Sequence, residues 1–215
     1  LPFVIITPDD TSIVTEGSEE RRRFLDNTLS QLNKRYLNEL ILYNKILKQR
    51  NAALKQFGEK GGYNRDLLAV YDQQMLGPAQ YIFDQRKVFF QHFIPILKKV
   101  HLEISGDSEM VDCEYKSQLH DQSFGLLLDQ NSEKDRILQR TTSGIHKDDL
   151  ILSLSGNPLK RFASQGQLKT FTIALKVAQY QMLKFEKKKP PLLLLDDIFD
   201  KLDGQRVNFL IQLLI

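Results

Sequence analysis

The sequence predicts an α/β fold with a helical-hairpin subdomain, and three of its features support this. Two long segments, near 18–57 and 65–100, repeat apolar residues every three or four positions, which is the spacing of amphipathic helices. A third segment of this kind follows Ser164. Short apolar runs with the length of strands, each bounded by turn residues, occupy 3–6, 150–154 and 192–195.

The first strand, 3–6, leads into a turn at Pro8, and the first long helix is expected to begin at Ser18. Serine is a favourable N-cap. Glu19 and Glu20 would lie in the first turn, where the helix dipole favours acids.

The two long helices are separated by Gly61-Gly62, so they are expected to pack as an antiparallel hairpin. Gly77-Pro78 and Pro95 are expected to interrupt and kink the second helix. The hairpin fits either an arm that projects from a body or a compact helical subdomain.

Beyond residue 100 the apolar period changes, and short segments on either side of Gly106 predict a β-hairpin. A short helix is expected near 132–140. The four leucines at 192–195 predict a strand buried on both faces, as in a parallel sheet.

The composition excludes several classes of protein. Hydrophobic residues make up 41% and charged residues 27%, as in an ordinary globular protein, and no apolar run approaches the ~20 residues of a membrane span. Cys113 is the single cysteine, so the chain has no disulfide framework. We expect Cys113 to be a half-buried strand residue. A chain without disulfides fits a reducing cytoplasm. The chain begins at Leu1 and stops at Ile215 inside an apolar run, so we expect a piece of a longer protein.

Positive charge is concentrated in the first long helix. Residues 18–60 hold ten Lys/Arg and five Asp/Glu, whereas the whole chain has a net charge of only +3. A basic helix can attract a polyanion such as DNA, and Arg21, Arg22 and Arg23 are the candidate contacts. The alternatives are a solvated helix face and structural ion pairs.

The strongest local motif is the run 192–195 followed by Asp196 and Asp197. A buried parallel strand delivers such carboxylates to the edge of its sheet where nucleotides bind in open α/β folds. In this Walker B pattern, Asp196 is the candidate Mg²⁺ ligand and Asp197 the candidate catalytic residue that positions the attacking water. A simple strand-to-turn transition is the alternative.

A second candidate site is the helix start Ser164-Gln165-Gly166-Gln167. A hydroxyl, backbone N–H groups and the positive end of the helix dipole converge there, which suits an anion. The alternative is a plain serine N-cap, worth about 1 kcal/mol.

The order of these motifs is typical of ABC-type ATPases, in which a signature helix precedes the Walker B strand. Asp200-Lys201-Leu202-Asp203 follows at the position of a D-loop. Five stretches closely resemble the RecF family of DNA-repair proteins, in the family's order along almost the whole chain: 20–26, 47–51, 144–150, 161–167 and 193–197.

The resemblance implies an ABC-ATPase-like fold, similar to the heads of SMC and Rad50 proteins, with 1–17 and 101–215 in the head and 18–100 in the helical arm. It implies an ATP-dependent DNA-binding protein of recombinational repair, replication and the SOS response, located in the cytoplasm. The implied partners are DNA, RecR- and RecO-type mediator proteins, and a second copy of the protein.

The resemblance also assigns roles within a dimer that closes around two ATP molecules with Mg²⁺. Ser164 and Gly166 of one head would meet the γ-phosphate held by the other, with Gln165 and Gln167 in the same ATP-binding segment. Asp203 would lie at the subunit interface.

The sequence departs from the family pattern in three places. Lys147 stands where the family has Arg, which keeps the charge but loses bidentate geometry. Leu168-Lys169 follows the signature where the family has Gln-Arg. No Gly-x-x-x-x-Gly-Lys-Ser/Thr phosphate loop occurs in the 215 residues. We therefore expect this piece to be inactive alone. The resemblance implies that the full-length protein is a weak DNA-dependent ATPase.

Two alternatives to this function are a non-enzymatic docking module for DNA or protein, and an SMC- or Rad50-like head. The short arm and the absence of zinc-hook cysteines disfavour the second. The remaining histidines, His92, His101 and His120, lack the spacing of metal ligands. His146, Asp148 and Asp149 are expected to give polar support beneath the site.

Overall fold

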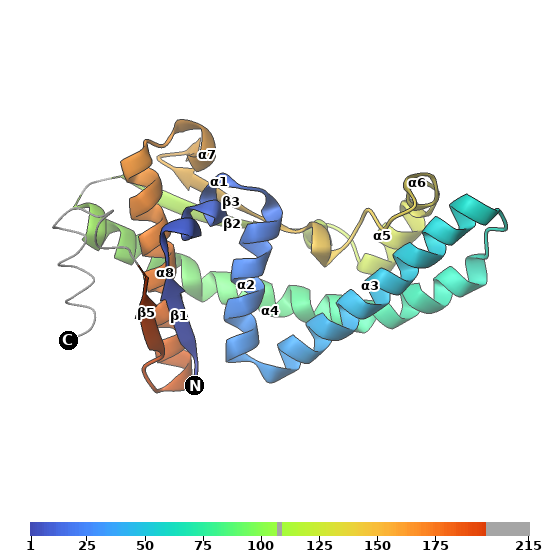
Figure 1. The fold of residues 1–215 in the computed structure, drawn as a ribbon, viewed down its shortest axis with the longest axis horizontal. Helices are drawn as coiled ribbons and strands as arrows, with labels where there is room; N and C mark the ends of the chain where they lie inside the picture. The colour runs from blue at the N-terminus through green and yellow to red at the C-terminus, as the bar shows by residue number, and fades with distance from the viewer. Residues whose placement is uncertain (107–108, 197–215) are drawn as a thin grey trace. The chain divides into compact units, whose positions relative to one another are not determined.

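The computed structural model describes residues 1–106 and 109–196, which form two compact units (Figure 1). The first unit contains Leu1–Leu32, Phe89–Glu114 and the described residues from Leu150 onward, and the second contains Asn33–Val88 and Tyr115–Asp149. These two units differ from the ranges expected from the sequence, 1–17, 18–100 and 101–215. That functional division stays a prediction.

Helices of very different length and short strands make up the described residues. The longest helix, α4, has 41 residues and contributes to both units. In chain order the elements, with 3-10 turns labelled η, are β1 (Phe3–Ile6), η1 (Pro8–Thr11), α1 (Ser12–Thr15), α2 (Ser18–Leu32), α3 (Lys34–Lys60), α4 (Arg65–Ser105), β2 (Val111–Lys116), η2 (Gln118–His120), α5 (Phe124–Gln130), α6 (Ser132–Leu138), η3 (Ile145–Lys147), β3 (Asp149–Leu154), β4 (Asn157–Pro158), α7 (Leu159–Phe162), α8 (Gln165–Lys187) and β5 (Leu192–Leu195).

A parallel pair of strands, β1 and β5, organises the first unit. Phe3 lies opposite Leu192 and Ile6 opposite Leu195. α8 packs against β1, and α2 packs against α8 (Figure 1). Since side chains alternate between the faces of a strand, one face of β1 contributes buried Val4 and Ile6 to the core.

The other face of the pair carries four apolar side chains that are 37–50% exposed: Phe3, Ile5, Leu192 and Leu194. The strand at 192–195 is confirmed, but its expected burial on both faces is wrong for the described residues. A purely apolar run does not report how many faces are covered, and in the described part of the chain α8 packs on one face only.

The helix after Ser164 is confirmed as α8, and its periodicity predicted its core face. Phe171, Leu175 and Ala178 are fully buried, and Met182 is 4% exposed. Phe185 continues the same apolar spacing but is 77% exposed, close to the end of the helix at Lys187.

Two predictions for α4 and its surroundings are wrong. The helix runs unbroken through Gly77-Pro78 and Pro95 to Ser105, and the β-hairpin expected around Gly106 does not form. Burial explains the unbroken helix, since apolar residues recur at helical spacing along its whole length and are fully buried: Met75, Ala79, Ile82, Phe93, Leu97 and Val100. Gly106 ends the helix with φ of +63°, and its N–H donates to the Leu102 carbonyl at 3.0 Å.

The first long helix is also divided, into α2 and α3, at Asn33. The backbone of Asn33 is extended, with φ of −137° and ψ of 108°, and its side-chain oxygen accepts from the N–H groups of Arg35 and Tyr36. The side-chain amide of Asn33 donates to Tyr81 and Gln85. Because apolar residues keep helical spacing across Asn33, the sequence pattern did not predict that a new helix begins there with Asn33 as its N-cap.

An antiparallel helical hairpin in the second unit confirms that part of the predicted fold. Its contacts pair ascending positions of α3 with descending positions of α4: Tyr36 with Arg86, Arg50 with Asp72, and Leu54 with Leu68. The helix expected near 132–140 is confirmed as α6, within this same unit.

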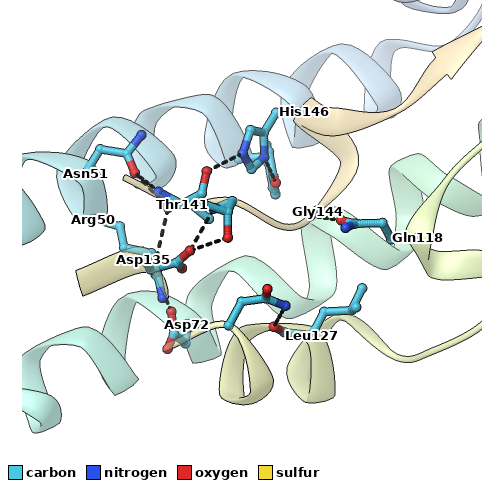
Figure 2. A network of polar contacts seen from close by, with 12 residues as sticks. Arg50, Asn51, Asp72, Gln118, Leu127, Asp135, Thr141, Gly144 and His146 are labelled. Atoms are coloured by element: carbon cyan, nitrogen blue, oxygen red, sulfur yellow. Dashed lines mark hydrogen bonds and ion pairs between the residues drawn. The ribbon is translucent and has the colours of Figure 1, made fainter. Parts of the chain in front are cut away.

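A buried polar network joins α3, α4 and α6 in the second unit (Figure 2). Arg50 is 1% exposed and donates to Asp72 at 2.6 Å, to Asp135 at 2.7 Å and to Thr141 at 2.9 Å. Asn51 accepts from both the N–H and the hydroxyl of Thr141. A guanidinium presents several donors in a fixed plane, so one arginine can satisfy two carboxylates and a hydroxyl at once.

A second sheet contains β2, β3 and β4, with β3 and β4 antiparallel. The strand expected at 150–154 is confirmed as β3. Cys113 was expected to be half-buried in a strand, and it lies in β2 with 1% of its surface exposed.

Candidate functional site

The first candidate site is the N-terminus of α8, where Ser164 is the N-cap, as the sequence predicts. The Ser164 hydroxyl accepts from the N–H of Gln167 at 3.2 Å, and the N–H of Ser164 donates to Oε1 of Gln167 at 2.6 Å. In this capping box the Ser164 hydroxyl acts as an acceptor, so its own hydrogen stays available to another acceptor. Ser164 is exposed, so that acceptor can come from outside the chain.

The surroundings of this helix N-terminus, Ser164–Gln167, which we call the α8 tip, favour negative charge. Gln165 and Gly166 form the first turn of α8, at the end of the helix where the dipole is positive. Exposed Lys160 and Arg161 of α7 precede the tip in the chain. Exposed donors together with positive charge suit an anion such as a phosphate group.

The second candidate site is the edge at which β1 and β5 end. Asp196 directly follows β5, and its N–H donates to the Ile6 carbonyl at 3.0 Å, so the parallel pairing continues to the ends of both strands. The residue is exposed. A carboxylate oxygen in this position is a ligand that Mg²⁺ accepts while keeping several waters.

An ion pair fixes the middle of α8 beside this edge. Lys176 Nζ lies 3.1 Å from Asp10 Oδ1, and Asp10 also accepts from the N–H of Thr7, directly after β1. Lys176 lies twelve residues beyond Ser164 in α8. At a helical rise of 1.5 Å per residue the two are about 18 Å apart along the axis.

Two predicted site residues, Asp197 and Asp203, lie outside the described residues, and their roles stay predictions. Within 1–106 and 109–196, no group of three or more His, Cys, Asp or Glu residues is arranged to hold a metal ion. A single exposed carboxylate at Asp196 fits Mg²⁺ held mainly through water. In that same part of the chain, no helix has the length and apolar character needed to cross a bilayer.

The candidate DNA contacts, Arg21, Arg22 and Arg23, lie in α2 and make local contacts. Arg21 donates to the Glu16 carbonyl at 3.0 Å. Arg23 is paired with Glu20 at 2.9 Å and lies 3.9 Å from Glu19, with 60% of its side chain exposed. These exposed contacts are weak, so they do not prevent the guanidinium groups from meeting a phosphate.

The 144–150 stretch lies in the second unit as far as Asp149, and it carries structural constraints there. Gly144 has φ of +120°, and a Cβ at this position would lie 2.6 Å from Phe124 and 2.7 Å from the Tyr43 hydroxyl. The site therefore requires glycine. Arg86 and Asp148 form a buried ion pair at 2.6 Å, and Tyr115 donates to the same Asp148 oxygen.

Burial changes the pKa values of the acidic groups around the Arg86–Asp148 pair. Burial raises the pKa of Asp148, whereas the Arg86 charge acts in the opposite direction. Burial also raises the pKa of Tyr115 well above its ordinary value, so the phenol stays a donor. The sequence pattern did not single out Arg86, which has no local motif.

His146 bridges α3 and the loop that follows α6 in the second unit. Its Nε2 lies 3.1 Å from the Thr141 carbonyl and its Nδ1 lies 2.7 Å from the Tyr43 hydroxyl (Figure 2). Since a carbonyl oxygen only accepts, Nε2 carries the proton and Nδ1 accepts from Tyr43. The expectation that His146, Asp148 and Asp149 support the nucleotide site from beneath stays a prediction.

Known proteins are similar in sequence to this chain over nearly its whole length. The chain is 46% identical over 213 residues to the DNA replication and repair protein RecF of Flavobacterium johnsoniae, and 42% identical over 212 residues to RecF of Cytophaga hutchinsonii. The chain is a RecF-family sequence. Both RecF alignments cover 99% of the chain and, respectively, 59% and 56% of the relative, so the chain spans somewhat more than half the length of these RecF proteins. A scan against protein-family models gives no match.

Solved RecF structures share the fold. The recombination mediator protein RecF–ATP of the RecFOR pathway matches with a TM-score of 0.88 and 28% identity, over 98% of this chain and 58% of that one. A second RecF structure of that pathway matches with a TM-score of 0.89 and 29% identity, over 99% of this chain and 60% of that one. The α/β fold with a helical hairpin, predicted from the sequence, is thus the RecF fold.

Proposed function

We propose that this RecF-family chain contributes to two composite ATP sites in a DNA-binding protein of recombinational repair and replication. The sheet edge with Asp196 serves the nucleotide of its own copy, and the tip with Ser164 and Gly166 serves the nucleotide of a second copy. The supporting observation is the separation of about 18 Å between Ser164 and Lys176, whose ion pair with Asp10 lies beside the sheet edge. This separation along α8 supports a tip that serves a nucleotide bound to another copy.

Each residue of the proposed site has a distinct task. The Ser164 hydroxyl and the first-turn N–H groups at Gln165 and Gly166 donate to γ-phosphate oxygens, while Gln167 caps the turn. Asp196 holds Mg²⁺ through water; this ion, when bound, neutralises charge on the phosphate oxygens.

The residues beyond the described part complete the proposal. Asp197 positions the attacking water, and Asp203 lies at the interface between copies. The phosphate loop that the 215 residues lack must come from elsewhere in the protein. In this scheme ATP joins two copies and hydrolysis separates them. From the RecF relationship we propose that the whole protein is a weak DNA-dependent ATPase.

The proposed partners follow from the RecF relationship and from charge. The similar structures are named as recombination mediators of the RecFOR pathway, so we propose RecR- and RecO-type proteins as partners and the cytoplasm as the location. DNA is the proposed polyanion for the basic α2–α3 segment, with Arg21, Arg22 and Arg23 as its first contacts.

The experiment that tests the composite site is Ser164→Asp in the whole protein from which these residues come. Aspartate is as good an N-cap as serine, so α8 keeps its start, but a carboxylate repels a phosphate. We expect ATP-dependent dimerisation, measured by sedimentation, to be lost while each copy still binds ATP.

Ser164→Thr is the matched control, because it keeps both the cap and the hydroxyl. This variant should dimerise with ATP nearly as the parent protein does. ATP-dependent dimerisation of Ser164→Asp at the parental nucleotide concentration would remove the α8 tip from the nucleotide site.

A further inference from the structure

The side-chain amide of Gln167 uses both of its ends within the first unit. Its Oε1 accepts from the N–H of Ser164 at 2.6 Å, and its Nε2 donates to Oε1 of Glu109 at 2.7 Å. Glu109 lies 58 residues earlier in the chain and is half-buried. The capping box at the tip of α8 is therefore anchored to a carboxylate outside the helix.

Chemistry fixes the orientation of this amide. A backbone N–H can only donate, so Oε1 must face Ser164, and an ionised carboxylate can only accept, so Nε2 must face Glu109. Rotating the amide by 180° would place oxygen against oxygen and nitrogen against nitrogen. Glu109 thereby selects the one amide orientation that closes the capping box.

The capping box in turn determines what the Ser164 hydroxyl can do. While Gln167 N–H donates to the hydroxyl oxygen, the hydroxyl hydrogen stays available to an external acceptor. Without an anchor, the Gln167 side chain is free to leave the Ser164 N–H, and the N-cap residue loses one of its two hydrogen bonds.

We propose that Glu109 is a positioning residue for the α8 tip: through Gln167 it holds Ser164 in the conformation that meets a phosphate of a nucleotide bound to a second copy. This inference rests on the proposed function. Glu109 does not touch the nucleotide. A carboxylate near a phosphate is unfavourable, so its benefit is geometric, through the hydrogen bond that it accepts.

Two substitutions separate geometry from charge. Glu109→Gln keeps an acceptor oxygen for Gln167 and removes the charge, whereas Glu109→Ala removes both. We expect Glu109→Ala to weaken ATP-dependent dimerisation about tenfold, the effect of losing one charge-assisted hydrogen bond. Glu109→Gln should stay within about threefold of the parent protein, since a neutral hydrogen bond is weaker but keeps the same geometry.

The readouts are chosen so that general loss of stability does not imitate this result. The whole protein is used, and each variant is measured for binding of a fluorescent ATP analogue to the monomer, for ATP-dependent dimerisation, and for turnover. Nucleotide binding to the monomer should not change, because the tip serves the other copy. Hydrogen exchange of the Ser164–Leu168 amides should become faster in Glu109→Ala and stay at the parental rate in Glu109→Gln.

Glu103→Ala is the matched control. It removes a carboxylate of the same unit that is 43% exposed and lies 3.9 Å from Lys99, so it should leave dimerisation unchanged. Parental dimerisation of Glu109→Ala would overturn the inference, and so would an equal defect in Glu109→Gln and Glu109→Ala. If Ser164→Asp also dimerised normally, the proposed function would fail; if Ser164→Asp failed to dimerise, the positioning role alone would be lost.

Discussion

Lys176 and Asp10 form a largely buried ion pair although 166 residues separate them in sequence. Their side chains are 11% and 15% exposed, so the pair is held mostly out of water. Because Asp10 also accepts from the N–H of Thr7, the pair ties the middle of α8 to the residues that follow β1.

Substituting Lys176→Met should destabilise the first unit by about 3 kcal/mol, because it leaves the Asp10 carboxylate buried without its counter-charge. Hydrogen exchange of α8 amides measures this loss for the unit itself. Lys98→Met is the control, since Lys98 and Asp112 are 49% and 57% exposed and their pair should contribute less than about 1 kcal/mol. Equal effects of the two substitutions would show that burial of the Lys176 pair has no energetic consequence.

Local signals were sufficient for the features that determine the candidate site. Ser164 was recognisable as an N-cap because hydroxyl chemistry and the following apolar spacing are read within a few residues. The strand 192–195 was recognisable from its apolar run and flanking prolines. Both elements, and therefore the order of the two motifs, followed from the sequence.

Features that depend on distant residues could not be predicted. Glu109 has no motif, and its contact with Gln167 spans 58 residues. The cap at Asn33 was masked because apolar residues keep helical spacing on both sides of it, and its amide is held by Tyr81 and Gln85 of another helix. Short apolar segments beside Gly106 are compatible with either a strand or a helix. The segment before Gly106 is helical in the structure, where Val100 and Ile104 in the last turns of α4 are buried.

Arg86→Met should destabilise the second unit by about 3–5 kcal/mol at neutral pH, because Asp148 is 2% exposed and loses its cationic partner. Burial already raises the pKa of Asp148, and removing Arg86 raises it further. An acid with a raised folded-state pKa stabilises the fold when protonated and loses this contribution as pH rises through that pKa. The deficit of Arg86→Met should therefore shrink as pH falls.

Adding Asp148→Asn to Arg86→Met tests the cause, because the neutral amide needs no counter-charge. Urea unfolding of the three proteins at several pH values is the measurement. A deficit that stays constant with pH, or that the second substitution fails to reduce, would contradict a role for the buried Asp148 charge.

His101 should make the first unit less stable in mild acid. It is 1% exposed, its Nδ1 has no hydrogen-bond partner in the described residues, and its ring lies 6.3 Å from that of Phe171. Burial lowers the pKa of His101, while the charge of Glu109 acts in the opposite direction. The unfolded chain then binds the proton more readily, so stability falls as pH drops below about 6.5, by at most about 1.4 kcal/mol per pH unit.

The substitution His101→Leu should flatten this pH dependence between pH 7 and pH 5, because no ionisable group is left to titrate at that position. Hydrogen exchange of α8 amides, corrected for the intrinsic pH effect, provides the comparison. His92→Gln is the control on the same helix, where the side chain is exposed. Identical pH profiles for the parent and His101→Leu would assign the acid sensitivity to other groups.

Asp197→Asn in the whole protein should separate ATP binding from hydrolysis. The amide has nearly the same shape as the carboxylate but cannot polarise a water molecule, so turnover should fall at least ~100-fold while ATP binding persists. Since hydrolysis is the proposed step that separates two copies, the ATP-bound dimer should accumulate, and sedimentation would detect it. Unchanged turnover would exclude Asp197 as the residue that positions the water. A matching measurement on the 215-residue chain alone should give no turnover, because the sequence contains no phosphate loop.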